Sequence, residues 1–255
     1  MHNQSISQAP VEGVLEGRNA VLEALKAGRT IDKVFIASGD TDSTLRHIAA
    51  LAKKSGAVVT NCDRRKLDQM SQTGVHQGVI AMAAARDYST IAEILRRAEE
   101  RGEAPLLVLC DEITDPHNLG AIIRTAECAG AHGVVIPKRR NSGLTAVVSK
   151  ASAGAIEYMP VARVNNLTSA IRELKEKGVW IYGTAADGAA SLYETDLTGP
   201  AAIVIGSEGS GIGRLVAEAC DFMVSIPMKG SINSLNASNA AAILLYETLR
   251  QRTTH

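Results

Sequence analysis

LLVLC at residues 106–110 and DPHNLGAIIRTA at residues 115–126 are the two neighbouring stretches that decide the fold. The first is continuously apolar, as is typical of a strand buried on both faces of a parallel sheet. In the second, the Asp115-Pro116 step disfavours helix before it, and either Asp115 or Asn118 can cap the helix that follows. A strand, a loop and a helix in this order predict one βα segment of an α/β fold.

The same alternation continues toward the C-terminus. Apolar runs predict further strands at residues 133–136, 179–182, 201–205 and 222–226, and helical spacing predicts helices near 119–130, 166–177, 213–220 and 238–250. Strands that alternate with helices over this length predict a doubly wound, parallel sheet.

Two more loops after predicted strands are rich in glycine, serine and asparagine. They are GSEGSG at residues 206–211 and IPMKGSINSLNASN at residues 226–239. The carboxyl ends of parallel strands meet at one edge of a sheet, where α/β proteins bind their ligands. Together with the loop at 115–118, these segments therefore predict one composite ligand site.

A smaller α/β module precedes this domain. It has predicted helices at 19–27, from 43 to Gly56 and from 63, and predicted strands at 33–37, 57–61 and 79–83. The expected organisation is a disordered tail at 1–11, a first domain at 12–86, a linker or connecting helix at 87–104 and a second domain at 105–255. Helical spacing from Ile91 to Ala98 leaves open whether that segment is a connector or the first helix of the second domain.

Charge and composition narrow the function classes. The 255 residues carry 27 basic and 27 acidic side chains, which argues against nucleic-acid binding by global charge but leaves local patches open. Two basic runs, at residues 64–66 and 138–140, are candidate phosphate contacts. Aromatic residues make up only 3% of the chain, too few for a base-stacking platform.

The four cysteines are widely spaced, with no Cys-x-x-Cys pair. This spacing supports neither a disulfide framework nor a zinc site, and it predicts buried, reduced thiols. The N-terminus lacks the basic start and apolar run of a secretory signal, and no apolar stretch approaches the roughly 20 residues of a membrane span. We therefore expect a cytoplasmic protein that binds neither membranes nor metals.

The loops leave several chemical interpretations open. Gly209, Gly211 and Gly213 invite comparison with a dinucleotide loop, but they do not match G-x-G-x-x-G, and Glu208 would repel a pyrophosphate. Arg124, among apolar helical residues, is either an ion-paired structural residue or a phosphate or substrate contact. A serine nucleophile in the third loop lacks both a nearby histidine and a Gly-x-Ser-x-Gly elbow. Ser238 is instead a candidate helix N-cap.

In order, spacing and residue type, the three loops resemble the motifs of the SpoU, or TrmH-like, family of RNA ribose 2'-O-methyltransferases, over roughly residues 104–250. The first module is similar to the substrate-binding domain of that family, and the likeness rests on Gly17-Arg18-Asn19-Ala20-Val21 and His76-Gln77-Gly78-Val79. The two-domain arrangement is similar to family members that methylate a guanosine of bacterial 23S rRNA.

This resemblance implies a C-terminal α/β knot, a trefoil-knotted and Rossmann-like parallel sheet, preceded by a small α/β substrate-binding domain. It also implies S-adenosyl-L-methionine as methyl donor, RNA (23S rRNA or a pre-ribosomal particle) as partner, and a homodimer whose sites draw on both subunits. By position, the implied cofactor contacts are Gly206, Ile226 and Leu235, with Gly183, Thr184 and Ala185 added, and the implied catalytic set is Asn118, Arg124, Glu208 and Asn236, with Ser234 as a further member.

The expected reaction is attack of a ribose 2'-hydroxyl on the sulfonium methyl group. A guanidinium is essentially never deprotonated in proteins, so we expect Arg124 to stabilise the developing alkoxide and to hold the adjacent phosphate, while Glu208 orients Arg124 or Asn118. The alternatives are a tRNA or antibiotic-resistance rRNA 2'-O-methyltransferase, a non-catalytic RNA-binding assembly factor, and a nicotinamide-dependent oxidoreductase.

Overall fold

The computed structural model describes residues 13–39, 42–185 and 189–254, so the predicted tail at 1–11 lies outside the described residues. The chain folds as two compact units. The first comprises Met1–Ala85 with Leu144–Ala146, and the second comprises Arg86–Gly143 with Val147–His255. The domain limits expected from the sequence stay a prediction.

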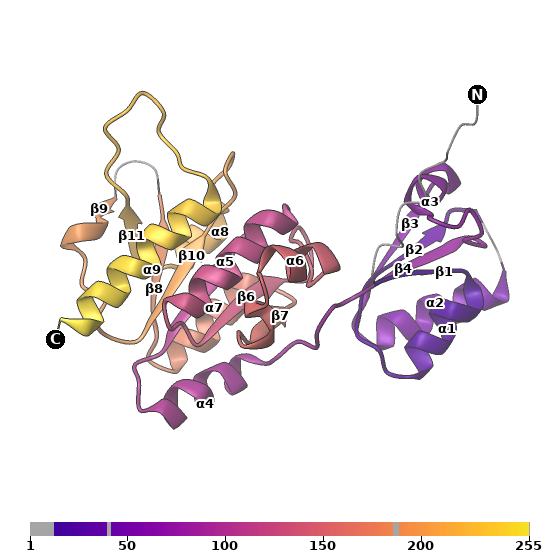
Figure 1. Ribbon diagram of the computed structural model, residues 1–255, viewed down its shortest axis with the longest axis horizontal. Helices are drawn as coiled ribbons and strands as arrows, with labels where there is room; N and C mark the ends of the chain where they lie inside the picture. Colours follow the sequence, from indigo (N-terminus) through magenta and orange to yellow (C-terminus); the bar gives the residue numbers. More distant parts are fainter. Residues whose placement is uncertain (1–12, 40–41, 186–188, 255) are drawn as a thin grey trace. The chain divides into compact units, whose positions relative to one another are not determined.

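The first unit is a four-stranded mixed sheet packed against helices (Figure 1). Its elements are β1 (Val14–Glu16), α1 (Arg18–Lys26), β2 (Ile31–Ala37), α2 (Ser43–Lys54), β3 (Val58–Cys62), α3 (Arg64–Met70) and β4 (Val79–Ala83). The strand order is β1-β4-β2-β3; β2 and β3 are parallel, and β4 is antiparallel to β1 and β2. Val21, Leu45 and Ile48 are fully or almost fully buried in the core between α1, α2 and the sheet. β1, with only three residues, was too short to give a sequence pattern.

The Glu16 carboxylate closes this unit by holding the segment after α3. It accepts hydrogen bonds from Ser71 Oγ at 2.6 Å, from the Gln72 backbone N–H at 2.5 Å and from Thr73 Oγ1 at 2.6 Å. Burial alone would raise the pKa of Glu16, but these hydrogen bonds outweigh it and lower the pKa to about 2. The ionised form is therefore the one that stabilises the fold.

Glu16→Gln should destabilise the first unit at neutral pH and flatten its stability in acid. Because the folded pKa is depressed, the contribution of Glu16 is complete above its unfolded pKa near 4.5 and is lost as pH falls toward about 2. Hydrogen exchange of residues 71–83 in the full chain, measured between pH 3 and pH 7, reports this difference. Glu23→Gln, at an exposed carboxylate of α1, is the control, and equal pH profiles for the two variants would refute the assignment.

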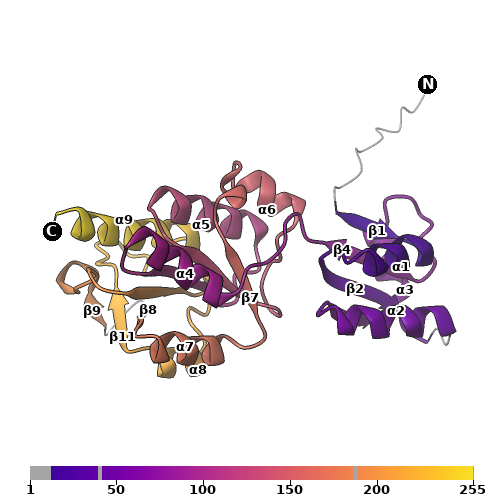
Figure 2. The ribbon, with the colours of Figure 1, turned by 90° about the horizontal axis from the view of Figure 1, so that it is seen from below.

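The second unit is built on a parallel sheet of seven strands in the order β7-β6-β5-β10-β8-β11-β9. The strands are β5 (Leu106–Cys110), β6 (Gly133–Pro137), β7 (Val161–Val164), β8 (Trp180–Thr184), β9 (Ala190–Ser191), β10 (Ala201–Ile205) and β11 (Phe222–Ser225). The helices are α4 (Ile91–Arg101), α5 (Pro116–Cys128), α6 (Ala146–Ala151), α7 (Leu167–Glu176), α8 (Arg214–Ala219) and α9 (Ala237–Thr253), with short 3-10 turns at Ala155–Glu157 and Leu192–Glu194. Figure 2 shows α5 and α9 on one face of the sheet and α7 and α8 on the other.

The central strands β5 and β10 pair in parallel from Leu106 and Ala201 to Cys110 and Ile205, and every residue of both is buried. Burial on both faces explains why these segments are continuously apolar instead of alternating. The predicted α/β class, with a parallel sheet after a small α/β unit, is confirmed. The trefoil knot stays a prediction.

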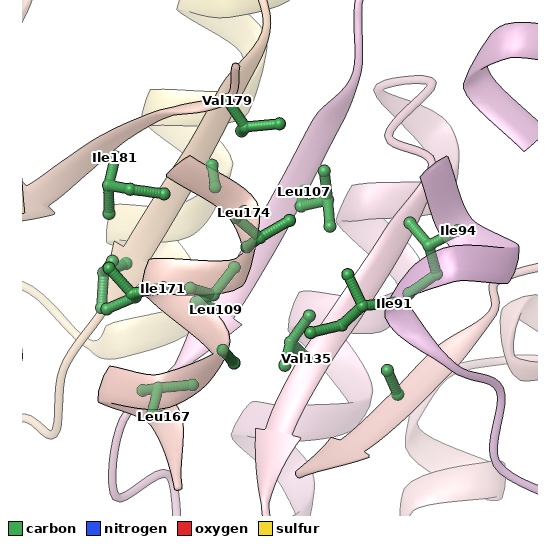
Figure 3. Close-up of a cluster of buried hydrophobic side chains, with 14 of the residues drawn as sticks. Ile91, Ile94, Leu107, Leu109, Val135, Leu167, Ile171, Leu174, Val179 and Ile181 are labelled. Atoms are coloured by element: carbon green, nitrogen blue, oxygen red, sulfur yellow. The ribbon is translucent and has the colours of Figure 1, made fainter. Parts of the chain in front are cut away.

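α4 belongs to the second compact unit. Ile91 and Ile94 pack with Leu167, Ile171 and Leu174 of α7 against β5 and β6 (Figure 3). The approach is close: a Cβ on Gly133 would lie 2.4 Å from Ile94 Cδ1. A glycine at the start of β6 is therefore a packing requirement.

The last helix is fixed at its C-terminal end by Arg252. Its guanidinium donates to the backbone carbonyls of Ala104 at 2.7 Å, Leu197 at 3.2 Å and Gly199 at 2.5 Å. Bonds from a cation to several carbonyls are stronger than neutral ones. They hold α9 beside the start of β5 and so fix the direction in which its N-terminus points.

The prediction of buried thiols is correct for Cys110 and wrong for Cys128, which ends α5 on the solvent side of that helix. Cys62 and Cys220 are half-buried, and all four thiols are unpaired. Burial raises the pKa of the Cys110 thiol to about 12, so this group is inert at neutral pH. Within the described residues, no helix combines the length and the apolar character that crossing a bilayer requires.

Candidate active site

The loops that follow β8, β10 and β11 enclose a cavity of about 430 Å³ at the carboxyl edge of the sheet. Gly206, Ile226 and Leu235 all line it, although they are far apart in sequence. The loop between β11 and α9, which stands above the sheet in Figure 1, supplies one wall. The volume of the cavity lies within the roughly 300–1,000 Å³ usual for small-molecule sites.

The loop after β10 forms a tight floor for this cavity. The Ser207 N–H donates to the Gly211 carbonyl at 3.1 Å, and the Gly211 N–H donates back at 2.9 Å. A Cβ on Gly206 would lie 2.2 Å from the Gly211 carbonyl carbon and 2.4 Å from the Ile212 nitrogen. These are backbone atoms that cannot rotate away, so position 206 accepts no side chain in this loop.

The lining combines apolar side chains with backbone groups. Ile226, Leu235 and Met223 supply the apolar surface, and the glycine-rich loop supplies exposed peptide groups. Such a lining fits a flat aromatic ring whose edge forms hydrogen bonds with the backbone, as a nucleoside offers.

The structure places five of the six predicted cofactor residues on this cavity: Thr184, Ala185, Gly206, Ile226 and Leu235. Gly183 is buried beside it, where a Cβ would lie 2.7 Å from Met223 Sδ and 2.8 Å from Cys220 Sγ. Gly183 thus permits the packing of β8 against its neighbours and does not line the cavity.

Three polar side chains meet at the rim: Asn118 in the first turn of α5, Glu208 in the loop after β10 and Asn236 at the start of α9. Glu208 Oε1 accepts hydrogen bonds from Asn118 Nδ2 at 2.7 Å and from Asn236 Nδ2 at 2.6 Å. Asn236 Nδ2 also lies 2.9 Å from Asn118 Oδ1. Glu208 itself lines the cavity. We call Asn118, Glu208 and Asn236 the rim cluster.

Helix caps explain why the two asparagines face Glu208. Asp115, and not Asn118, caps α5 by accepting from the His117 N–H at 3.0 Å. Asn236 caps α9 through Oδ1, which accepts from the backbone of Ser238 and Asn239. The prediction of Ser238 as the N-cap is therefore wrong: α9 begins two residues earlier than the capping pattern indicated, and Ser238 is already helical.

The remaining two predicted catalytic residues lie differently. Ser234 lines the cavity. Arg124 is exposed on α5, six residues after Asn118, which at 3.6 residues per turn turns its side chain about 120° away from that of Asn118. Within the described residues, no hydrogen bond or ion pair holds its guanidinium, and it lines neither the cavity nor the rim cluster.

The sequence missed some residues of the cavity. Met223 in β11 and Ala237 and Ala240 in α9 also line it. An apolar residue within a strand or a helix indicates core as readily as ligand contact, so no sequence pattern could have identified these positions. No group of His, Cys, Asp and Glu in the described residues is arranged to hold a metal ion.

Comparisons with known proteins agree for both units. Residues 105–246 match the model of the SpoU rRNA methylase family, and residues 14–89 match the RNA 2'-O ribose methyltransferase substrate-binding model. A Bacillus subtilis protein named as a putative TrmH family tRNA/rRNA methyltransferase is 50% identical over 236 residues, covering 92% of this chain and 94% of its own length. A Staphylococcus aureus protein of the same designation is 44% identical over 239 residues, covering 94% and 96%.

Solved structures show the same likeness. The SpoU methyltransferase AviRb from Streptomyces viridochromogenes in complex with the cofactor AdoMet aligns with a TM-score of 0.61 at 25% identity, covering 95% of this chain and 91% of that one. An AdoMet-bound rRNA methyltransferase from Sinorhizobium meliloti aligns with a TM-score of 0.58 at 26% identity, covering 93% and 86%.

Proposed function

We propose, from the premise that this chain belongs to the SpoU rRNA methylase family of RNA methyltransferases, that it transfers the methyl group of S-adenosylmethionine to a ribose 2'-hydroxyl of a guanosine in 23S rRNA. The observation that carries the proposal is the meeting of the cavity with the rim cluster. Glu208 belongs to both, so a cofactor in the cavity would present its reactive end to polar side chains.

The residues of the cavity would hold the cofactor by shape and backbone contact. Gly206, Ile226 and Leu235 would surround the adenosine, with Thr184 and Ala185 beside them. When bound, S-adenosylmethionine supplies a methyl group already activated by its sulfonium. The chain therefore has mainly to align the 2'-hydroxyl with that methyl group and to help its proton leave.

The rim cluster would provide the alignment. Glu208 accepts hydrogen bonds from both asparagine amides, which holds both in place. The Asn236 amide is engaged at both ends, since its Nδ2 also donates to Asn118 Oδ1 and its Oδ1 caps α9. The second N–H of Asn118 would therefore be the group offered to the ribose. A side chain held by two partners loses little entropy when substrate arrives. In the transfer, the ribose oxygen would take the methyl group, S-adenosylhomocysteine would be left as product and the hydroxyl proton would pass to water, while a nearby cation would stabilise the developing alkoxide.

Arg124 would be that cation, supplied by the second subunit of a homodimer. In one chain its guanidinium lies away from the rim cluster, on the solvent side of α5. α5 packs along α9, whose Tyr246 is 51% exposed although the helix is otherwise rich in buried apolar residues. In a symmetric dimer formed through these helices, residues of one chain would reach the site of the other.

The first unit would bind the RNA. Arg18 donates from Nε to the Gln77 carbonyl at 3.1 Å, and its backbone N–H donates to Gln77 Oε1 at 3.1 Å. These bonds join the two segments on which the family likeness of this unit rests. A polar recess of about 450 Å³ lies beside them, lined by Arg18, Asn19, Thr44, Arg64 and Gln77, which suits a sugar-phosphate backbone.

The experiment is methyl transfer from labelled S-adenosylmethionine by the full chain to unmodified 23S rRNA and, in parallel, to tRNA. We expect label on 23S rRNA at a guanosine whose 3' phosphodiester becomes resistant to alkali, because alkaline cleavage needs a free 2'-hydroxyl. Glu208→Gln, with one hydrogen-bonding oxygen replaced, should be strongly impaired. Label on tRNA alone would overturn the rRNA assignment, and RNA binding without transfer would indicate an assembly factor.

A further inference from the structure

A second crevice, of about 320 Å³, lies at the carboxyl edge of the same sheet and shares no lining residue with the first cavity. The segments that follow four adjacent strands, β7, β6, β5 and β10, form its walls. They contribute residues 165–168, Arg139 and Arg140, Asp111 and Glu112, and residues 213–216. None of these residues belongs to the rim cluster.

The crevice occupies a special place in the topology. β5 and β10 are neighbours in the sheet, but α5 after β5 covers one face and α8 after β10 covers the other (Figure 2). This is a topological switch point, where open α/β sheets commonly bind ligands. The first cavity lies further along the same edge, at the carboxyl ends of β10, β8 and β11.

Arginines and a helix N-terminus dominate the chemistry of this crevice. Arg139 is exposed, and within the described residues no acidic side chain pairs with it. Arg214 forms an ion pair with Glu218 of its own helix at 2.6 Å, and its side chain is 78% exposed. Exposed ion pairs of this kind are weak and exchange readily for another anion. The first turn of α7, at Leu167 and Thr168, adds backbone N–H groups.

The two carboxylates in the crevice already have partners. Asp111 Oδ2 accepts from the Gly213 N–H at 2.8 Å, and Glu112 pairs with Arg140 at 3.0 Å. Among the residues that line the crevice, three arginines stand against two carboxylates, while Glu218, the partner of Arg214, lies outside the lining. Arg139 lies in the loop after β6, and Arg214 is the first residue of α8, after β10; both are exposed to a ligand.

We propose that this crevice binds a phosphodiester group of the RNA strand whose ribose lies at the rim cluster, with Arg139 and Arg214 as its two charged contacts. The inference rests on the proposed function and assigns the basic run at 138–140 a place within it. Glu208 and Gly213 are five residues apart on one loop, so they are separated by at most about 18 Å. The crevice therefore lies close enough to the rim cluster for one RNA strand to reach both.

The test is the double variant Arg139→Ala/Arg214→Ala in the full chain. We expect the KM for RNA to rise at least tenfold while kcat changes less than twofold. The slope of log binding constant against log salt should fall by about 0.7 for each phosphate that the variant no longer neutralises. Affinity for S-adenosylhomocysteine, measured by calorimetry, should not change.

The matched control is Arg101→Ala/Arg172→Ala, which removes the same charge from exposed positions on α4 and α7 that do not line the crevice. Equal effects of the two double variants would overturn the proposal, as would a loss of cofactor affinity in the first. If inorganic phosphate bound in the crevice of the wild-type chain while the double variant bound RNA as tightly as the wild type, the crevice would be a site for a free anion instead. Failure of the wild-type chain to methylate RNA would refute the proposed function. Comparing RNA affinity between the two double variants would still show whether the crevice binds RNA.

Discussion

Gly206→Ala is expected to abolish binding of S-adenosylmethionine and, with it, methyl transfer. The added Cβ would lie 2.2 to 2.4 Å from the backbone of Gly211 and Ile212, so the floor of the cavity must move. Overpacking of this kind typically costs about 1–3 kcal/mol, and here the whole displacement falls on the loop that would contact the cofactor. Calorimetry with S-adenosylhomocysteine measures the loss.

Gly199→Ala is the control, at a glycine just before β10 that does not line the cavity. No atom lies within 4 Å of a Cβ at position 199, and its backbone needs no left-handed conformation. We expect cofactor affinity within about twofold of wild type and an unchanged melting temperature. If Gly206→Ala bound the cofactor as well as Gly199→Ala does, the cavity would not be the cofactor site.

Arg124→Ala is expected to reduce methyl transfer by at least about 100-fold, the scale of losing one charge-stabilising group, with cofactor affinity unchanged. The side chain is exposed and lines no part of the cavity, so its removal should leave the fold intact. Single-turnover methylation and calorimetry, run on the same preparation, separate the two effects. Joint loss of transfer and cofactor binding would make Arg124 a structural residue.

Mixed dimers test whether Arg124 acts across subunits. Subunits carrying Arg124→Ala, mixed with an equal amount of subunits carrying Glu208→Gln and allowed to exchange, should recover about a quarter of wild-type activity, because half of the dimers then hold one intact site. No recovery after verified exchange would place Arg124 and Glu208 in the same subunit's site. The proportion of mixed dimers is measured by native mass spectrometry.

The sequence predicted most of the second unit because its strands are buried on both faces. A continuous apolar run such as residues 106–110 has few structural alternatives, and the loops after such runs converge wherever the strands are parallel. The shared cavity of Gly206, Ile226 and Leu235 follows from that convergence. β9 was missed because it has only two residues, and β7 because Arg163 interrupts its apolar run.

The helix caps could not be predicted from the sequence because neighbouring polar residues compete for the same position. Asn236 and Ser238 are both good N-caps, and only the register of α9 against the sheet decides between them. In the same way, Asp115 takes the cap of α5 and leaves Asn118 free to contact Glu208. The solvent-facing position of Arg124 depends on helix phase, and a partner subunit cannot be derived from spacing within one chain.

Asn236 has two roles, since its Oδ1 caps α9 and its Nδ2 donates to Glu208 in the rim cluster. A descendant that had lost its enzymatic activity would still keep this asparagine, or replace it with serine, to protect the helix. Aspartate would cap equally well, but it would set a second carboxylate against Glu208. The residue at position 208 is therefore the better indicator of whether a relative is catalytically active, because Glu208 caps no helix.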